Sequence, residues 1–102
     1  MLKIIITERA EIALDDIADF YSTKYNIDRA IKVLDSIDEI FLRIAKAPFN
    51  FPKSFDIKQP DDSIRQAIVH DTFKVIFQIQ DDCVEIIEIF HGNRNPELLK
   101  DI

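Results

Sequence analysis

Glycine, cysteine and tryptophan are nearly absent from this 102-residue chain, which has one glycine, one cysteine and no tryptophan. A single glycine excludes both the P-loop and the GxGxxG nucleotide-binding turn, and no GxSxG motif marks a nucleophilic serine. Cys83 has no second cysteine to pair with, and together with two widely spaced histidines it does not form a zinc-ligand pattern. We therefore expect no disulfide, no metal and no cofactor.

Long apolar runs are missing as well. No stretch approaches the ~20 apolar residues of a membrane span, and the short run in MLKIIIT is followed at once by charged residues, unlike a signal peptide. A single cysteine suits a reducing compartment, so we expect a cytoplasmic protein without a membrane partner. The net charge of −6 is unusual for a nucleic-acid binder and fits a protein that docks a basic partner.

The first half of the chain has strong helical periodicity. Residues 2–6 form a short β-branched run that is typical of a strand. Apolar residues then recur at helical spacing over 8–24 and again over 28–46, and Asn26 or Asp28 is suited to cap the second helix. Because only a few residues separate the two helices, we predict an antiparallel helical hairpin.

The second half alternates like a sheet. Residues 46–62 contain three prolines and form a loop, and strands are predicted over 63–69, 73–79 and 83–91. We expect the phenylalanines of the loop to pack against the core, with base stacking as the less favoured role: Phe49, Phe51 and Phe55. The acidic pairs of the chain fit a solvated helix face or turns better than paired acid/base catalysis: Asp15-Asp16, Asp61-Asp62 and Asp81-Asp82.

The side chains of the last two strands alternate with different regularity. One face of 73–79 carries Phe73, Val75, Phe77 and Ile79, and the other face carries Lys74, Ile76 and Gln78. Strict alternation over 83–91 gives one face with Val84, Ile86, Glu88 and Phe90, and another with Glu85, Ile87, Ile89 and His91. This second pattern is imperfect, so it assigns no core face.

These elements predict one domain over residues 1–102 with the order β-α-α-β-β-β. The fold class is α+β: a helical hairpin packs on a small antiparallel sheet, which the first strand can join. Gly92 provides a turn after the last strand. Asn95 as N-cap and Pro96 at the first helical position then predict a short C-terminal helix or turn.

Three cations near the sheet are candidate functional residues. Arg65 shares a predicted strand face with Ala67 and Val69, which favours either a site or a buried ion pair with Glu85 or Glu88. His91 has the ordinary pKa range of a general acid/base, although a lone histidine at a strand end is often structural. Arg94 is able to hold a phosphate or a partner's carboxylate, or to form a weak surface ion pair.

Three stretches resemble a known family: IRQAIV, FKVIFQI and, above all, IIEIFHGNRNPELL. They resemble the RelE/ParE superfamily of type II toxin–antitoxin toxins. The match is closer to ParE, once described as plasmid stabilisation proteins, in which the last strand often ends in His-(small)-x-Arg-x-Pro. The resemblance covers nearly the whole chain and implies the β-α-α-β-β-β order. It also implies that a set of basic residues gathers near the concave sheet face and the C-terminal end. The matching residues here are Arg65, Lys74, His91 and Arg94, and Pro96 completes the tail motif.

The resemblance to RelE implies a ribosome-dependent mRNA endoribonuclease, in which Arg65, Lys74 and Arg94 hold phosphate and His91 transfers protons. RelE-like members commonly use a tyrosine or a histidine near the C-terminus as acid/base, and this chain has no tyrosine after Tyr25. The lysine pair of RelE is represented at best by two residues of the proline-rich loop, Lys53 and Lys58. These departures favour a ParE-like toxin, although most ParE proteins are basic and this chain is acidic.

The resemblance therefore implies three alternative functions. The first is inhibition of DNA gyrase by protein–protein contact, with neutralisation by a co-encoded antitoxin. The second is the RelE-like nuclease acting on mRNA at the ribosome. The third is a degenerate, non-toxic module that binds an antitoxin. A homodimer or a heterotetramer with the antitoxin is compatible with each.

Overall fold

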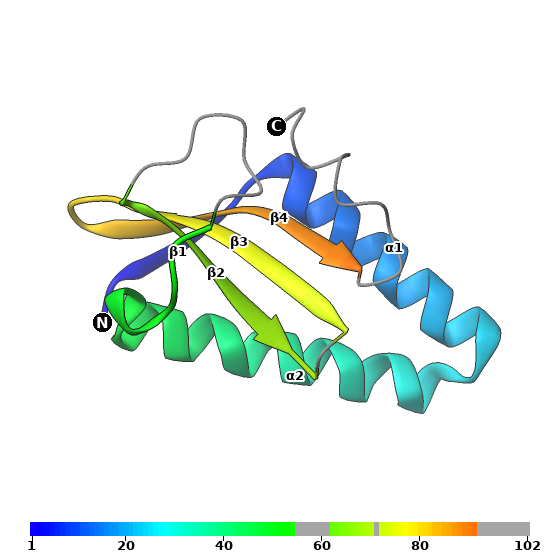
Figure 1. Cartoon of the computed structure of the whole chain (residues 1–102). Coiled ribbons are helices and arrows are strands. Elements are labelled where there is room, and N and C mark those ends of the chain that lie inside the picture. The colour runs from blue at the N-terminus through cyan, green and yellow to red at the C-terminus, as the bar shows by residue number, and fades with distance from the viewer. Residues whose placement is uncertain (55–61, 71, 92–102) are drawn as a thin grey trace.

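A computed structural model of the chain describes residues 1–54, 62–70 and 72–91 (Figure 1). The elements follow the predicted order and lie close to the predicted boundaries. They are β1 (Lys3–Ile6), α1 (Glu8–Lys24), α2 (Ile27–Lys46), the short 3-10 helix η1 (Pro48–Asn50), β2 (Ile64–Val69), β3 (Phe73–Ile79) and β4 (Cys83–His91). No helix in these parts of the chain is long and apolar enough to cross a membrane.

Side-chain caps fix where both long helices begin. The Thr7 hydroxyl accepts a hydrogen bond from the backbone N–H of Ala10 at 3.1 Å, ahead of α1. The Asn26 side chain accepts from the backbone N–H of Arg29 at 2.8 Å, ahead of α2. Each cap pairs an N–H group that has no partner inside its helix. Of the two residues predicted as caps for the second helix, Asn26 is confirmed.

The sheet is mixed, because its first strand is parallel to its neighbour. The strand order is β1-β4-β3-β2, with antiparallel pairing from β2 through β4 and parallel pairing of β1 with β4. Lys3 is opposite Cys83, and Ile6 is opposite Ile86. A parallel pair needs a long crossover connection, and here the helical hairpin and the rest of the sheet provide it. The predicted α+β fold class is confirmed: β2, β3 and β4 form the antiparallel sheet, and the first strand joins it in the parallel direction.

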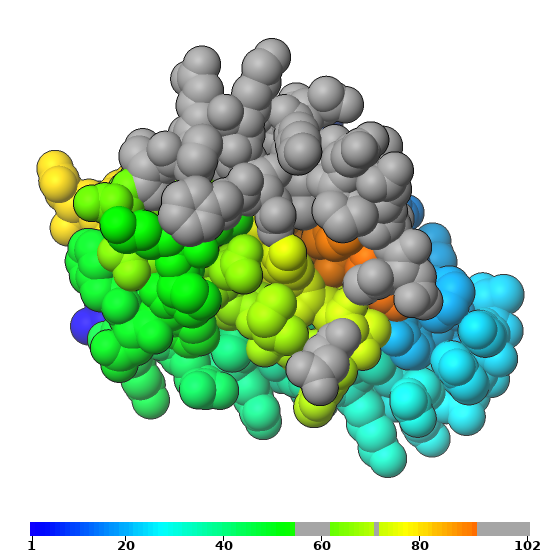
Figure 2. Space-filling view, viewed as in Figure 1, coloured from blue at the N-terminus to red at the C-terminus, as the bar shows by residue number. Residues whose placement is uncertain are grey.

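Both helices lie on one face of the sheet, and the main core fills the space between them (Figure 1). The predicted core face of β3 is confirmed, since Phe73, Val75 and Phe77 are buried in this cluster and Ile79 packs against it. Ile76 points to the other face, where it forms a small second cluster with Ile64 and half-buried Ile87. Figure 2 shows β2 and β3 at the surface between the segment that ends α2 and the last strand.

A β-bulge in β4 breaks the strict alternation predicted for that strand. Ile76 pairs with Glu88 and the next residue, Phe77, pairs with Ile86, so Ile87 has no partner opposite it. Because of this extra residue, the side chains of β4 that follow Ile87 point to the opposite faces from those that strict alternation gives. Ile86 and Ile89 therefore both lie in the main core. The prediction that placed Ile86 and Ile89 on opposite faces is therefore wrong, because it assumed one residue of β4 for each residue of β3.

The phenylalanines of the proline-rich loop do not behave alike. Phe51 packs edge-to-face on Phe77, with ring centroids 5.8 Å apart, so it belongs to the core margin as predicted. Phe49 is 65% exposed, so its predicted packing in the core is wrong. Its ring lies instead beneath the Arg65 guanidinium, 5.2 Å from the ring centroid. Phe55 lies outside the described residues.

Candidate functional site

His91, the last described residue of β4, lies in an aromatic cluster. Its ring stacks on Phe73, the residue opposite it on β3, with centroids 5.1 Å apart and an interplanar angle of 25°. Phe20 of α1 contacts it edge-on at 5.4 Å, and Tyr21 lies at 6.2 Å. These contacts hold the imidazole between the sheet and α1, so the structural role proposed for His91 is supported by its surroundings.

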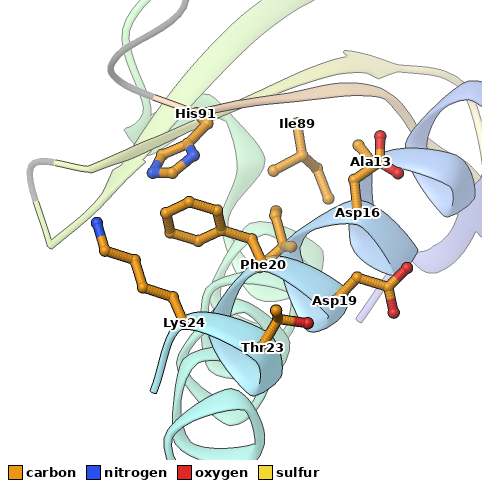
Figure 3. Close-up of a pocket in the computed structure, with 9 residues that line it drawn as sticks. Ala13, Asp16, Asp19, Phe20, Thr23, Lys24, Ile89 and His91 are labelled. Atoms are coloured by element: carbon orange, nitrogen blue, oxygen red, sulfur yellow. The ribbon is translucent and has the colours of Figure 1, made fainter. Parts of the chain in front are cut away.

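A hollow of about 480 Å³ opens beside His91, between α1 and the end of β4 (Figure 3). Its floor is apolar and is made by Ala13, Ile17, Phe20 and Ile89. In the close-up, the Phe20 ring faces the His91 imidazole, and the Lys24 chain extends toward the same opening. Phe20 is 41% exposed although its spacing predicted a core position, because its ring lines this hollow.

Charged groups of both signs border the hollow. Asp16 and Asp19 lie along α1 on one side, and Lys24 lies at the helix end. The Lys24 ammonium lies 5.2 Å from the centroid of the Phe20 ring, a cation–π arrangement. An apolar floor with a charged border is suited to an apolar side chain that has polar neighbours, which is the composition of a peptide segment.

Arg65 lies at the opposite end of the sheet from His91. Its Nε–H donates to the backbone carbonyl of Asp62 at 2.9 Å, and its Nη1 donates to the carbonyl of Phe51 at 2.9 Å. The ion pair predicted with Glu85 or Glu88 is not what the structure shows. The Glu88 carboxylate is joined instead to Arg9, and Arg65 ties the loop before β2 to the sheet.

Lys74 lies on the sheet face that the helices do not cover. It is opposite Ile68 on β2 and Phe90 on β4, in alternation with Phe73 and Val75, which face the core. The side chain is half-buried. Lys74 therefore projects from the other side of the sheet than His91.

The structure does not bring Arg65, Lys74 and His91 to one point. Arg65 is opposite Phe77 and His91 is opposite Phe73, so four residues of β3, roughly 13 Å of strand, separate their positions. Lys74 lies on the other face. The other members of the predicted set, Arg94 and Pro96, lie outside the described residues, as does Gly92.

An ion pair beside the bulge was not foreseen from the sequence. Arg9 of α1 donates from Nε to the Glu88 carboxylate at 2.6 Å, and Glu88 is 8% exposed. The second carboxylate oxygen of Glu88 accepts from the backbone N–H of Ile89 at 3.0 Å. The only signal in the sequence is an acidic residue in a mostly apolar strand that also contains Glu85, and the structure was needed to find its partner.

The described residues contain no group of three or more histidine, cysteine or acidic side chains that could hold a metal. Cys83 is buried, and its thiol donates to the side-chain oxygen of Gln80 at 3.0 Å. Burial raises the pKa of this thiol, and the neighbouring Asp82 carboxylate raises it further. The thiol is therefore protonated and unreactive at neutral pH, which is the opposite of a nucleophilic cysteine.

Comparison with known proteins decides the family. A family model described as ParE toxin of type II toxin-antitoxin system, parDE, matches residues 4–96, which is most of the chain. The chain belongs to the ParE toxin family. Among solved structures, a chain of the chromosomal ParDE TA system from P. aeruginosa is similar, with a TM-score of 0.72 and 18% sequence identity.

The similarity to the P. aeruginosa chain spans 89% of this chain and 96% of that one. At this identity it supports the ParE-like fold, including the helical hairpin and the four-stranded sheet. No curated protein matches. The resemblance to a ParE-type toxin that IIEIFHGNRNPELL indicated is thus confirmed at the level of family and fold.

Proposed function

We propose that this chain is the toxin of a type II pair, that a co-encoded antitoxin neutralises it, and that it inhibits DNA gyrase through a protein–protein contact in the cytoplasm. Family membership supports the toxin role. A DNA-gyrase target is favoured because the described candidate cations are dispersed. Arg65 is bound to backbone carbonyls and Lys74 lies on the other face from His91, so these residues do not form a shared phosphate cradle.

Phosphoryl chemistry on RNA needs several cations around one phosphate, because charge develops there in the transition state. A protein contact needs only a shaped surface with a few buried anchors. The hollow beside His91, with its apolar floor, suits the second requirement better. The RelE-like nuclease is the alternative, with Arg65, Lys74 and Arg94 on phosphate and His91 as acid/base. A non-toxic antitoxin-binding module is the third possibility, and the acidic charge of the chain favours it.

The deciding experiment expresses the protein alone in its own host and maps 5′ RNA ends within minutes, in parallel with a gyrase supercoiling and cleavage assay on purified protein. We expect intact mRNA, a DNA-damage response and impaired supercoiling. New mRNA ends positioned by codon would contradict the proposal in favour of the nuclease. Continued growth with unaffected gyrase and intact mRNA would leave the non-toxic module.

Paired variants separate chemistry from fold. Arg65→Lys keeps the charge, and Arg65→Ala removes both the charge and the two hydrogen bonds to carbonyls. If the protein is a gyrase inhibitor, the two variants should differ in stability and retain inhibition wherever they fold. If it is a nuclease, Arg65→Ala should abolish cleavage in protein whose circular dichroism and unfolding midpoint show it to be folded.

A further inference from the structure

The hollow beside His91 has an apolar floor that opens to solvent. Ala13, Ile17 and Ile89 form the bottom of the hollow and are buried in the main core. Phe20 forms a wall, and 41% of its surface is exposed. A concave apolar surface of this kind is suited to receive aliphatic side chains, which would remove the Phe20 ring from water.

The hollow begins at the point where the described part of the chain ends. His91 is the last described residue of β4 and also part of the lining, and Figure 3 shows its imidazole facing the Phe20 ring. Eleven residues follow His91 in the sequence, and we call residues 92–102 the tail. Gly92 permits a sharp turn directly after the strand. The tail, which lies outside the described residues, therefore starts at the rim of the hollow.

The sequence of the tail gives it one apolar side. Asn95 as N-cap and Pro96 at the first helical position predict a helical turn over 96–102. Three aliphatic side chains fall on one side of such a turn: Leu98, Leu99 and Ile102. A helical turn with an apolar side needs an apolar surface to cover that side, and the hollow is the nearest one to the start of the tail.

The dimensions of the tail match those of the hollow. The part of α1 that lines the hollow runs from Ala13 to Lys24, which is about 16 Å of helix at ~1.5 Å per residue. An extended segment of four residues, 92–95, spans about 13 Å, so it is long enough to cross the rim. A helical turn over 96–102 is about 10 Å long and fits within the length of the hollow.

The covalent link favours the tail over other occupants of the hollow. A segment tethered at the rim by a short linker has an effective concentration in the millimolar range, whereas a second copy competes only at its own concentration. The charged side chains of the lining do not select a polyanion. Asp16 and Asp19 are acidic, and only Lys24 and His91 are able to carry positive charge.

We propose that the tail folds back into the hollow beside His91 in the free protein and that Leu98 and Leu99 cover the Phe20 ring. This contact is autoinhibitory for any partner that binds the same floor, because such a partner must first displace the tail. The inference goes beyond the proposed function, since it concerns the protein alone and does not depend on its target.

The direct test is NMR on the full-length wild type with carbon-13 in its methyl groups. The first set of probes is Leu98 and Leu99 in the tail, and the second set is Ala13, Ile17 and Ile89 in the floor. We expect NOEs between the two sets. We expect them to persist when labelled protein is diluted into an excess of unlabelled protein, because the contact lies within one chain.

Two results of this measurement would overturn the proposal. The first is a set of leucine NOEs that reach only the sheet face that the helices do not cover, at Ile68 or Ile76, or that reach no other part of the protein. The second is the loss of the NOEs on dilution into unlabelled protein, which would identify a second copy as the occupant. Neither gyrase nor antitoxin is present, so a negative result leaves the proposed function standing.

Matched variants of the tail measure its effect on the hollow. Leu98→Ser/Leu99→Ser removes most of the apolar side, and the control Glu97→Ser/Lys100→Ser changes the opposite side of the same turn; neither alters the net charge. We expect the first variant to shift the signals of the Phe20 ring and of the floor methyl groups, and the control to leave them in place. Added peptide of residues 92–102 should restore these signals in the first variant at millimolar but not at micromolar concentration.

The variants also have outcomes that contradict the proposal. Equal shifts of the Phe20 signals in both variants, or no shift in either, would show that the apolar side of the tail does not cover the hollow. The wild-type NOEs require no substitution, so they decide the matter if a variant fails to fold.

Discussion

The Arg9–Glu88 pair offers the sharpest stability prediction. Glu88 is 8% exposed, and its carboxylate has two donors, Arg9 Nε at 2.6 Å and the backbone N–H of Ile89 at 3.0 Å. Arg9→Met keeps much of the side-chain volume and removes the charge. The variant leaves a nearly buried carboxylate with a single neutral donor, which is more costly than losing both partners.

The size of this loss in stability depends on how far each partner of the ion pair is buried. A pair of unit charges about 4 Å apart interacts by ~4 kcal/mol at an effective dielectric constant of ~20. Half of the Arg9 side chain is in solvent, at 52% exposed, so solvent screens the pair well below that figure. Hydrogen bonds to charged groups contribute ~1.5–3 kcal/mol. We expect Arg9→Met to lower the free energy of unfolding by about 1.5–2.5 kcal/mol.

A double-mutant cycle isolates the pair from other effects of substitution. Arg9→Met, Glu88→Gln and the double variant are unfolded in urea and followed by circular dichroism, and we expect a coupling energy of about 1–2 kcal/mol. The Lys53–Asp62 pair is a matched control, because its atoms are 2.7 Å apart but Asp62 is 84% exposed. Its cycle, with Lys53→Met and Asp62→Asn, should give less than about 0.5 kcal/mol. Equal coupling in the two cycles would refute the reasoning from burial.

Three further predictions concern single positions. Cys83 should resist iodoacetamide at pH 7.5 in the folded protein and react once urea unfolds it. Because burial raises the pKa of its thiol above 9.0, the unfolded chain loses this proton more readily than the folded protein does. The free energy of unfolding should therefore fall as pH rises beyond 9.0, and Cys83→Ser should flatten that fall. Thr7→Ala should cost about 1–2 kcal/mol by urea unfolding, since it removes the α1 cap and the single O–H that the carbonyls of Ile86 and Ile87 share, whereas Thr7→Ser should cost less. His70→Gly should raise the Tm by relieving a left-handed backbone, worth about 1 kcal/mol.

Each of the three has an outcome that contradicts it. Rapid alkylation of folded protein would show that Cys83 is not protected by burial. Equal stability of Thr7→Ala and the wild type would show that the Thr7 hydroxyl does not stabilise the start of α1. A lower Tm for His70→Gly would mean that the contact of the His70 Nε2 with the Ser36 hydroxyl, 3.0 Å apart, outweighs the backbone strain.

Most of the fold could be predicted from local sequence patterns. Both long helices could be placed from apolar spacing, and Asn26 from its suitability as a cap, because these signals depend on residues within one or two turns. The core face of β3 followed from its alternation for the same reason. The parallel pairing of β1 with β4 could not be predicted in this way, since it joins residues about eighty positions apart.

The errors share a physical cause, which is non-local geometry. The bulge at Ile87 is defined by the register of β3 against β4, and no residue type in β4 marks it. For Arg65 the sequence favoured either a site or a buried ion pair, whereas in the structure its guanidinium donates to backbone carbonyls of Phe51 and Asp62 in the preceding loop. In both cases the sequence indicates that a polar group needs a partner, but it does not indicate which partner the group finds.

The packing of the β2–β3 turn beside α2 could not be predicted from the sequence, because the residues that meet there are far apart in the chain. The His70 Nε2 lies 3.0 Å from the hydroxyl of Ser36, a residue of α2. A positive φ at His70 is a local mark of that packing, but it is visible only in the structure.

The pairing of β1 with β4 also has a consequence for how the protein is synthesised. Lys3 is opposite Cys83 in the sheet, so the hydrogen bonds between β1 and β4 can form only after β4 has been synthesised. Closing so large a loop slows folding, and the helical hairpin can form long before the sheet is complete. A ribosome-bound chain that lacks β4 therefore presents α1 and the inner face of β3 without a finished fold. For a protein of a toxin family, translation itself delays the appearance of the completed surface until β4 has been made.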